Sequence, residues 1–372
     1  MLKISVNDCV IKILLILYLI ITLLKFFAIT TVLVGNILLV LIGSFSLFFC
    51  ISKKGLKAQK PFIMYVLFYT LAGLLSWIYN GNMNLQELFW PLGFMSFGLL
   101  FLNFNISYKT SCFIYCAFCI LVILTIFSGG GIASLNTHGS RNAIGMYVIL
   151  FFSFCLIAAY QNKASVSLLL PVVGLLLCIM AIGRSGIISG FLMCFFFAIF
   201  KFEKGVGTRR KIWLLWLVPI IYLLLFVFAY DRFSEFFDSA FLNYERRELE
   251  SIRMLIWSDY IYKVRSSFSN LLFGAEIADS FWLNAFSQNL HNSFFMLHAK
   301  YGILGFILTI YLIIKTLVIL FKEKNVYLLI PFLLILFRMN FDYTNFNASL
   351  DTILIFYLMY PYYLKDLHNI KG

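Results

Sequence analysis

Long apolar runs, each close to the length of one membrane crossing, follow one another along the 372-residue chain. A helix needs about 20 apolar residues to cross a hydrocarbon core of roughly 30 Å, whereas a membrane barrel would show strands of alternating polarity. The pattern therefore predicts an all-α polytopic integral membrane protein with about 12 transmembrane helices. We expect helices near residues 10–30, 31–51, 61–80, 87–104, 111–128, 142–160, 166–183, 186–200, 212–230, 292–321, 326–340 and 348–364.

One long polar stretch, residues 231–291, interrupts this pattern. It divides the chain into residues 1–230, with transmembrane helices 1–9, the stretch itself as a large extramembrane loop with short helices, and residues 292–372, with helices 10–12 and a tail. Because the loop concentrates ionisable side chains in an otherwise lipid-soluble chain, we expect the chemistry of the protein there.

Composition and charge support this layout. The chain is 62% hydrophobic and 12% charged, against roughly 25% charged in soluble domains. Lys and Arg gather in alternate connections, such as 53–60 and 201–211, and basic connections stay in the cytoplasm. We therefore expect both termini in the cytoplasm and residues 231–291 on the outer side of the membrane. The net charge of +13 follows from this distribution and does not indicate binding to nucleic acid.

The stretch Ser165–Phe200 is too long for one crossing and short for two. A helical hairpin that turns at Gly183 and Gly186, below the outer surface, would satisfy this length. Arg184 would then lie at membrane depth, where a charge needs a cavity or a partner. A functional role is the favoured interpretation, and a structural pairing is the alternative.

Two further groups on the expected outer side could carry chemistry. Arg253 and Trp257 are four residues apart and share a helix face, so the indole is expected to pack on the guanidinium. His291 and Asn292 precede a predicted helix. A guanidinium donates two parallel hydrogen bonds to phosphate, and a histidine exchanges a proton near neutral pH, so it can activate a sugar hydroxyl. A capping or surface role is the simpler alternative for His291.

The remaining ionisable groups favour simpler interpretations. Glu87 begins a helix and is an alternative base. Arg338 and Asp342 lie at another outer junction and could pair with each other. His298, two turns beyond His291, is expected to be structural or to line a cavity.

No metal or cofactor is predicted. The outer side carries no HExxH, CxxC or DxD motif, so arginine would supply the charge that a divalent cation provides elsewhere. Cys112, Cys116 and Cys119 share one helix face, but small hydrophobic side chains are the favoured interpretation over a metal site.

Several short motifs resemble, in their order and placement, the signature of the O-antigen polymerase/ligase superfamily. In and just after the polar loop these are Arg253-x-x-x-Trp257, Asn270–Gly274, His291–Phe294 and Gly302–Gly305. Upstream, Gly183–Gly186 resembles the Ser-Arg-small motif of this family, with Gly183 in the Ser position. Gly139–Gly145 is similar to its Gly/Asn-rich helix entry, with Arg141 where Pro is common. The resemblance covers nearly the whole chain.

This resemblance implies a GT-C-like fold and a metal-independent inverting glycosyltransferase. The donor would be a glycan on undecaprenyl diphosphate, and the acceptor a hydroxyl of another glycan. By matching position, Arg184 and Arg253 would bind the donor diphosphate and His291 would activate the acceptor. The expected substrate-binding residues are Arg141, which we add for its charge and place, with Asn142, Trp257 and Asn292.

The predicted function is an O-antigen polymerase that joins lipid-linked oligosaccharide repeats on the periplasmic face of the bacterial inner membrane. Membrane lipid and a chain-length regulator protein are candidate partners. An O-antigen ligase, which transfers polymer to lipid A-core, differs in its acceptor only and stays open. A lipid-linked oligosaccharide flippase is a third candidate, although a transporter is expected to show internal repeats and ionisable groups near the bilayer midplane.

Overall fold

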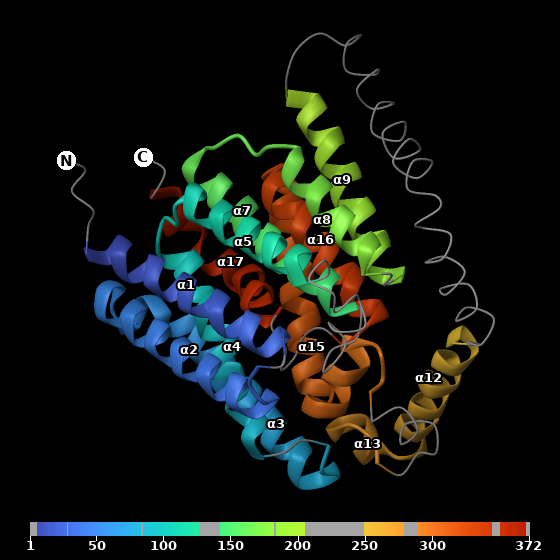
Figure 1. The fold of residues 1–372 in the computed structure, drawn as a ribbon. Coiled ribbons are helices and arrows are strands. Elements are labelled where there is room, and N and C mark those ends of the chain that lie inside the picture. The colour runs from blue at the N-terminus through green and yellow to red at the C-terminus, as the bar shows by residue number, and fades with distance from the viewer. Residues whose placement is uncertain are drawn as a thin grey trace, which may run out of the picture.

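The computed structural model describes residues 6–27, 29–82, 85–125, 142–181, 184–204, 249–278, 289–343 and 350–369. Within these residues the fold is helical and contains no strand (Figure 1). The predicted helix 212–230, residues 231–248 and 279–288 of the polar stretch, and Arg141 lie outside the described residues. Every other predicted helix has a counterpart in the structure.

The described elements, in chain order, are α1 (Val6–Phe26), α2 (Val32–Lys54), α3 (Leu56–Asn80), η1 (Leu85–Leu88), α4 (Trp90–Asn103), α5 (Tyr108–Thr125), α7 (Asn142–Asn162), α8 (Leu169–Met180), α9 (Arg184–Lys204), α12 (Leu249–Ser266), α13 (Phe268–Phe273), α15 (Ser293–Lys322), α16 (Val326–Phe341) and α17 (Asp351–Asn369).

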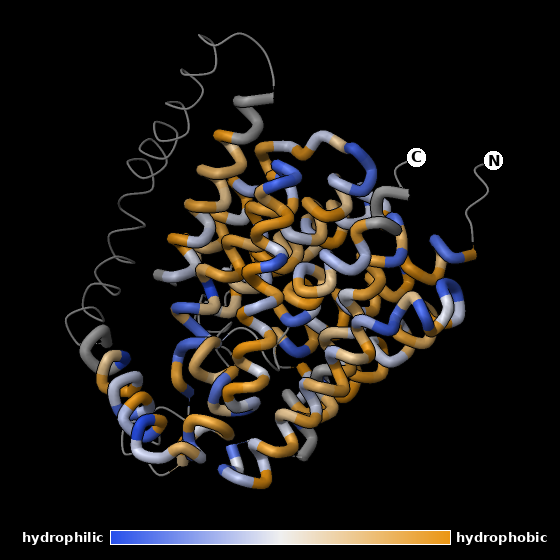
Figure 2. Tube along the Cα trace, turned by 180° about the vertical axis from the view of Figure 1, so that it is seen from behind, coloured by the Kyte–Doolittle hydropathy of each residue, from blue (hydrophilic) through white to orange (hydrophobic). Residues whose placement is uncertain are grey.

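Six of the described helices are long and apolar enough to cross a membrane: α1, α2, α3, α5, α7 and α15. Four more, α4, α8, α9 and α16, are apolar but shorter. Figure 2 shows apolar residues running along the helices, with polar residues mostly in the connections and in α12. The all-α, polytopic membrane character is therefore confirmed, whereas the number of spans stays a prediction.

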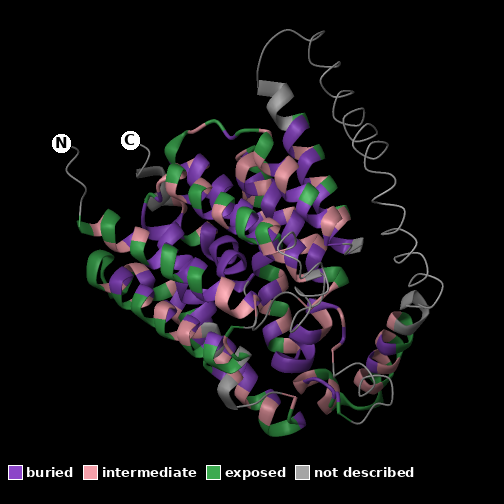
Figure 3. Cartoon of the chain, in the orientation of Figure 1, coloured by how far each residue is buried: buried purple, intermediate pink, exposed green. Residues whose placement is uncertain are grey.

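The core lies between α2, α4, α7 and α17. Residues 350–360, which include most of α17, are all buried, and α4 packs against both α2 and α17 (Figure 3). At the outside of the bundle, large apolar side chains such as Phe48 (69% exposed) point away from the protein. Such side chains are stable there only where lipid covers them.

The predicted helix pair is present as α8 and α9, which pack against each other. Gly186, expected in the turn, lies inside α9 instead, and Gly183 lies outside the described residues. With 12 residues, α8 is about 18 Å long, well short of the hydrocarbon core of roughly 30 Å. The first turn of α9 also meets the first turn of α7, since a Cβ atom on Gly145 would lie 2.8 Å from the Cα of Gly186. Two motifs far apart in the chain are therefore in direct contact.

The described part of the polar stretch folds as α12 and α13, beside the start of α15. The buried face of α12 carries Ile256 and Tyr260, which pack with Leu290 and Met296. Leu255, the residue before Ile256, is 41% exposed. A helix turns 100° per residue, so Leu255 faces away from the i, i+4 line that Ile256 and Tyr260 form.

Candidate functional site

His291 lies directly before α15, in a backbone conformation that few side chains adopt. Its φ is 49°, a left-handed value at which His is one of the more tolerated residues. Its backbone N–H donates to the Asn289 side chain at 2.8 Å. Asn292 caps α15, since its side-chain oxygen accepts from the N–H groups of Phe294 and Phe295, and its amide nitrogen donates to the Asn340 carbonyl. The start of α15 is thereby fixed to the end of α16.

Asp342, directly after α16, faces the imidazole. Nδ1 of His291 lies 3.9 Å from Oδ1 of Asp342. The Ser293 hydroxyl holds the same turn by donating to the Asp342 carbonyl at 2.8 Å. Burial alone raises the pKa of the Asp342 carboxyl, but interaction with His291 and the charge of Arg338 outweigh burial and hold that pKa below its ordinary value. Asp342 is therefore a carboxylate at neutral pH.

Arg338 connects this carboxylate to α9. Its side chain is fully buried; one guanidinium nitrogen lies 3.5 Å from Oδ2 of Asp342, and another donates to the hydroxyl of Ser185. The predicted pairing of Arg338 with Asp342 is confirmed. The sequence interpretation did not connect this pair to the predicted site, although an arginine inside an apolar run is the same signal that singled out Arg184.

Arg253 and Trp257, on α12, complete the neighbourhood of His291. The charge of Arg253 is among those that act on the guanidinium of Arg338. Nε1 of Trp257 donates to the carbonyl of Leu290 at 2.8 Å. The expected packing of the Trp257 indole on the Arg253 guanidinium is not found, although the structure describes both residues. The indole instead meets Phe295 edge-on, with ring centroids 5.8 Å apart.

The other predicted site residues are placed by their backbone only. Arg184 is the first residue of α9 and Asn142 the first of α7, and their side chains lie outside the described part of the chain, as does Arg141 altogether. The contact of Gly145 with Gly186 nevertheless brings the two helix starts together. The residue after Arg184 is Ser185, which Arg338 contacts.

His298 has a structural role, as expected. Its Nε2 lies 2.9 Å from the carbonyl of Leu271, and since a carbonyl only accepts, Nε2 carries the proton. Nδ1 therefore accepts from the hydroxyl of Tyr260, at 2.8 Å. One imidazole thus joins α12, α13 and α15.

The motif Asn270–Gly274 also fastens the polar segment to the membrane helices. The amide of Asn80, at the end of α3, donates to the carbonyls of Phe273, Gly274 and Ala299. Gly302 breaks the helical geometry of α15 (φ 60°, ψ −170°), and the carbonyl of Leu272 lies where a side chain at Gly302 would begin. No feature of the sequence indicated the role of Asn80.

Glu87, the alternative base, is held in an ion pair. Nζ of Lys300 lies 2.6 Å from its carboxylate, and both side chains are almost fully buried. The ammonium also lies 5.3 Å from the centre of the Tyr343 ring. This pair ties η1 to α15 next to the turn that carries Asp342.

The assembled site combines an imidazole that faces a carboxylate, which the buried Arg338 holds, with the cation Arg253 on α12. Such a set can stabilise a developing anion and accept a proton. Among the described residues there is no group of three or more His, Cys, Asp or Glu side chains suited to a metal ion. No protein-family model matches the chain, and no curated protein matches it either.

Proposed function

We propose that the protein is an O-antigen polymerase, a metal-independent inverting glycosyltransferase of GT-C type in the bacterial inner membrane. It would join oligosaccharide repeats carried on undecaprenyl diphosphate, at a site that faces the periplasm, within a bundle of about 12 spans. The observation that supports this proposal is the line His291–Asp342–Arg338–Ser185, which joins the starts of α15 and α9.

His291 would act as the base. Its Nδ1 faces Asp342, so Nε2, on the opposite edge of the ring, would take the proton of the acceptor hydroxyl. The Asp342 carboxylate would stabilise the imidazolium that forms. The hydroxyl oxygen then attacks the anomeric carbon from the face opposite the diphosphate, so that the configuration inverts as the bond to the diphosphate breaks.

The leaving diphosphate carries away the bonding electron pair, and arginine would stabilise its charge. Arg253 and Arg184 are suited to this task, because guanidinium groups remain charged and bind phosphate oxygens in pairs. Arg338 has a different role. It is buried and contacts Ser185 and Asp342, so it positions the carboxylate and does not touch substrate.

The short helix α8 supports a site below the membrane surface. A hairpin whose first helix is about 18 Å long would begin at one surface and turn inside the bilayer. The start of α9 would then lie about 12 Å short of the opposite surface, below the headgroups in which a polyprenyl diphosphate presents its phosphates.

The deciding experiment is electrophoresis of surface glycans from a strain that lacks the protein. A single repeat on the lipid A-core would support a polymerase. Bare core with accumulated lipid-linked polymer would instead identify the ligase, and bare core without polymer would identify a flippase.

Single variants test the site within the same assay. We expect His291→Ala and Arg253→Ala each to abolish the ladder at normal protein levels. Arg184→Lys should also fail, since an ammonium cannot reproduce a two-pronged contact. Arg265→Ala is a matched control, because Arg265 lies exposed in the last turn of the same helix as Arg253. A normal ladder from His291→Ala would remove that residue from the mechanism.

A further inference from the structure

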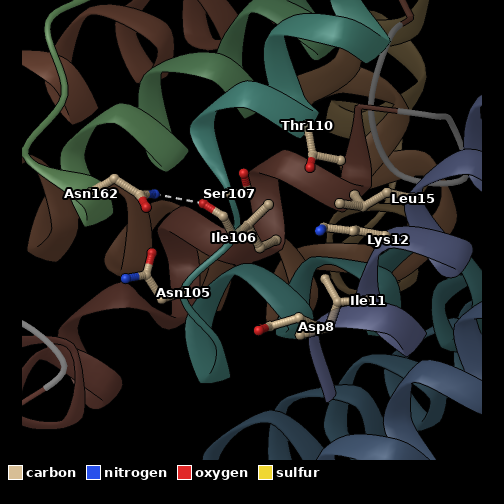
Figure 4. A pocket seen from close by; sticks show the side chains of 9 residues that line it. All are labelled: Asp8, Ile11, Lys12, Leu15, Asn105, Ile106, Ser107, Thr110 and Asn162. Carbon is tan, nitrogen blue, oxygen red and sulfur yellow. Dashed lines mark hydrogen bonds between the residues drawn. The ribbon is translucent and has the colours of Figure 1, made fainter. Parts of the chain in front are cut away.

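A cavity of about 310 Å³ opens where α1 and α5 begin and α7 ends (Figure 4). Asp8 and Lys12 of α1 line one side, and Asn105 and Ser107 line the other. Thr110 lies at one end of the cavity, in the first turn of α5. None of these residues belongs to the proposed glycosyl-transfer site.

The two sites lie at opposite ends of α7. Gly145, in the first turn of α7, meets Gly186 beside the arginine line, whereas Asn162, its last residue, lines the cavity. With 21 residues, α7 spans about 30 Å, close to the thickness of a hydrocarbon core. The cavity therefore lies near the opposite membrane surface.

Hydrogen bonds hold one wall of the cavity in place. The backbone N–H of Ile106 donates to the Gln161 side chain at 3.0 Å, and the amide of Asn162 donates to the Ile106 carbonyl at 2.6 Å. Gln161 in turn donates to the carbonyl of Phe104 at 3.1 Å. The turn between α4 and α5 is thus fastened to the end of α7, so the cavity is preformed.

The order of polarity with depth suggests the ligand. Asp8, Lys12 and Leu15 follow one another on one face of α1, at i, i+4 and i+7. Asp8 is exposed, Lys12 is half-buried and Leu15 is buried. The negative charge therefore lies nearest water, the positive charge about 6 Å deeper along the helix, and an apolar floor beneath both. This order holds whichever side of the membrane α1 begins on.

We propose that the cavity binds the headgroup of an ethanolamine phospholipid. In this lipid the phosphate lies deeper than the ammonium, which matches Lys12 below Asp8. The hydroxyls of Ser107 and Thr110 are placed to donate to phosphate oxygens. One turn further along α5, Phe113 is 63% exposed, and it would contact an acyl chain.

The carboxylate of Asp8 selects among headgroups. A purely anionic headgroup, such as phosphatidylglycerol, would be repelled by Asp8 and could satisfy Lys12 only. A choline headgroup carries a positive charge but no N–H to donate to the carboxylate, so it lacks the charge-assisted hydrogen bond. Phosphatidylethanolamine satisfies both charges, and the proposal does not depend on the reaction at His291.

The test measures lipid retention by native mass spectrometry of the purified full chain, after incubation with phosphatidylethanolamine, phosphatidylglycerol or phosphatidylcholine. We expect the wild type to retain the ethanolamine lipid about fivefold better than the others, the change expected for one partly screened charge contact. Lys12→Met should lose this retention, and Asp8→Asn should shift the preference toward phosphatidylglycerol. Lys53→Met, an exposed lysine in the last turn of α2, should behave as the wild type.

Equal retention of the three lipids by the wild type would overturn the proposal. So would an unchanged ethanolamine preference in both Asp8→Asn and Lys12→Met, when their melting temperatures match that of the wild type. A competition experiment adds soluble phosphoethanolamine, at millimolar concentration, to the protein with its bound lipid. It should displace little lipid, and complete displacement would assign the cavity to a soluble phosphate ester instead.

Discussion

The indole nitrogen of Trp257 donates a hydrogen bond of 2.8 Å to the carbonyl of Leu290, the residue before His291. The contact joins α12 to the segment that carries the proposed base. Leu290 itself is fully buried, so its carbonyl has little access to water as an alternative partner. Trp257 therefore has a physical reason to influence His291 without contacting the imidazole.

Trp257→Phe tests this connection. The ring can still pack on Phe295, but the N–H donor is lost, which costs about 1 kcal/mol and corresponds to roughly fivefold in rate when the loss falls on the positioned base. We expect repeat polymerisation by the purified protein to slow by about this factor, with an unchanged melting temperature to within a few degrees. Tyr262→Phe, on the exposed side of the same helix, is the control. Full activity of Trp257→Phe would show that Phe295 alone holds the segment.

Asp342→Asn should lower both activity and stability. The substitution leaves the buried guanidinium of Arg338 without its carboxylate, a loss of about 3 kcal/mol for a broken buried pair. Thermal unfolding in detergent measures the loss, with Glu276→Gln, an exposed carboxylate, as the control. Equal melting temperatures of wild type and Asp342→Asn would contradict the role of the pair.

The same variant has an expected pH profile. Folding lowers the pKa of Asp342 below its ordinary value of 3.8, so the stability that its ionised form contributes is complete above that value. It is lost only as the pH falls through the lower pKa of the folded state. The stability difference between wild type and Asp342→Asn should therefore shrink as the pH falls below about 4. A difference that changed across neutral pH would point to another titrating group.

The close approach of α13 to α15 predicts an unequal pair of glycine substitutions. Gly302 and Gly81 both have a positive φ, 60° and 64°. At Gly81 ψ is 8°, a left-handed conformation in which alanine is strained by about 1–2 kcal/mol, whereas at Gly302 ψ is −170°, a region that essentially only glycine occupies. At Gly81 nothing lies within 4 Å of the added carbon, whereas at Gly302 the carbon would meet the carbonyl of Leu272. Gly302→Ala should therefore lower the melting temperature much more than Gly81→Ala. Equal shifts would indicate that α13 moves aside freely.

Hydrophobic length was sufficient to predict where the described apolar helices lie. The packed pair α8 and α9 was predictable for the same reason, because the length of an apolar run restricts how it can cross a bilayer. Contacts between segments that are distant in the chain were harder to predict from the sequence. Arg338 and Asp342 are four residues apart and were paired from the sequence, but the contact of Arg338 with Ser185 spans 153 positions, and no local pattern encodes such a distance.

Side-chain roles were predicted less well than positions. Asn292 and Trp257 were expected to bind substrate, but their polar atoms contact the backbone around His291. Capping and backbone contacts depend on which carbonyls and N–H groups are left unpaired at a helix end. That depends on the tertiary fold, which a linear motif does not specify.

Glu87 and Lys300 provide a test that separates a structural carboxylate from a catalytic one. Each single substitution, Glu87→Gln or Lys300→Met, leaves one buried charge without its partner, and we expect each to lower the free energy of unfolding by about 3 kcal/mol. The double variant removes both charges, so it should recover most of that loss. If His291 is the base, the double variant should also polymerise repeats at close to the wild-type rate per folded molecule. A double variant that is stable but inactive would assign the proton transfer to Glu87 instead, because recovery of the fold without recovery of turnover leaves the missing carboxylate as the cause.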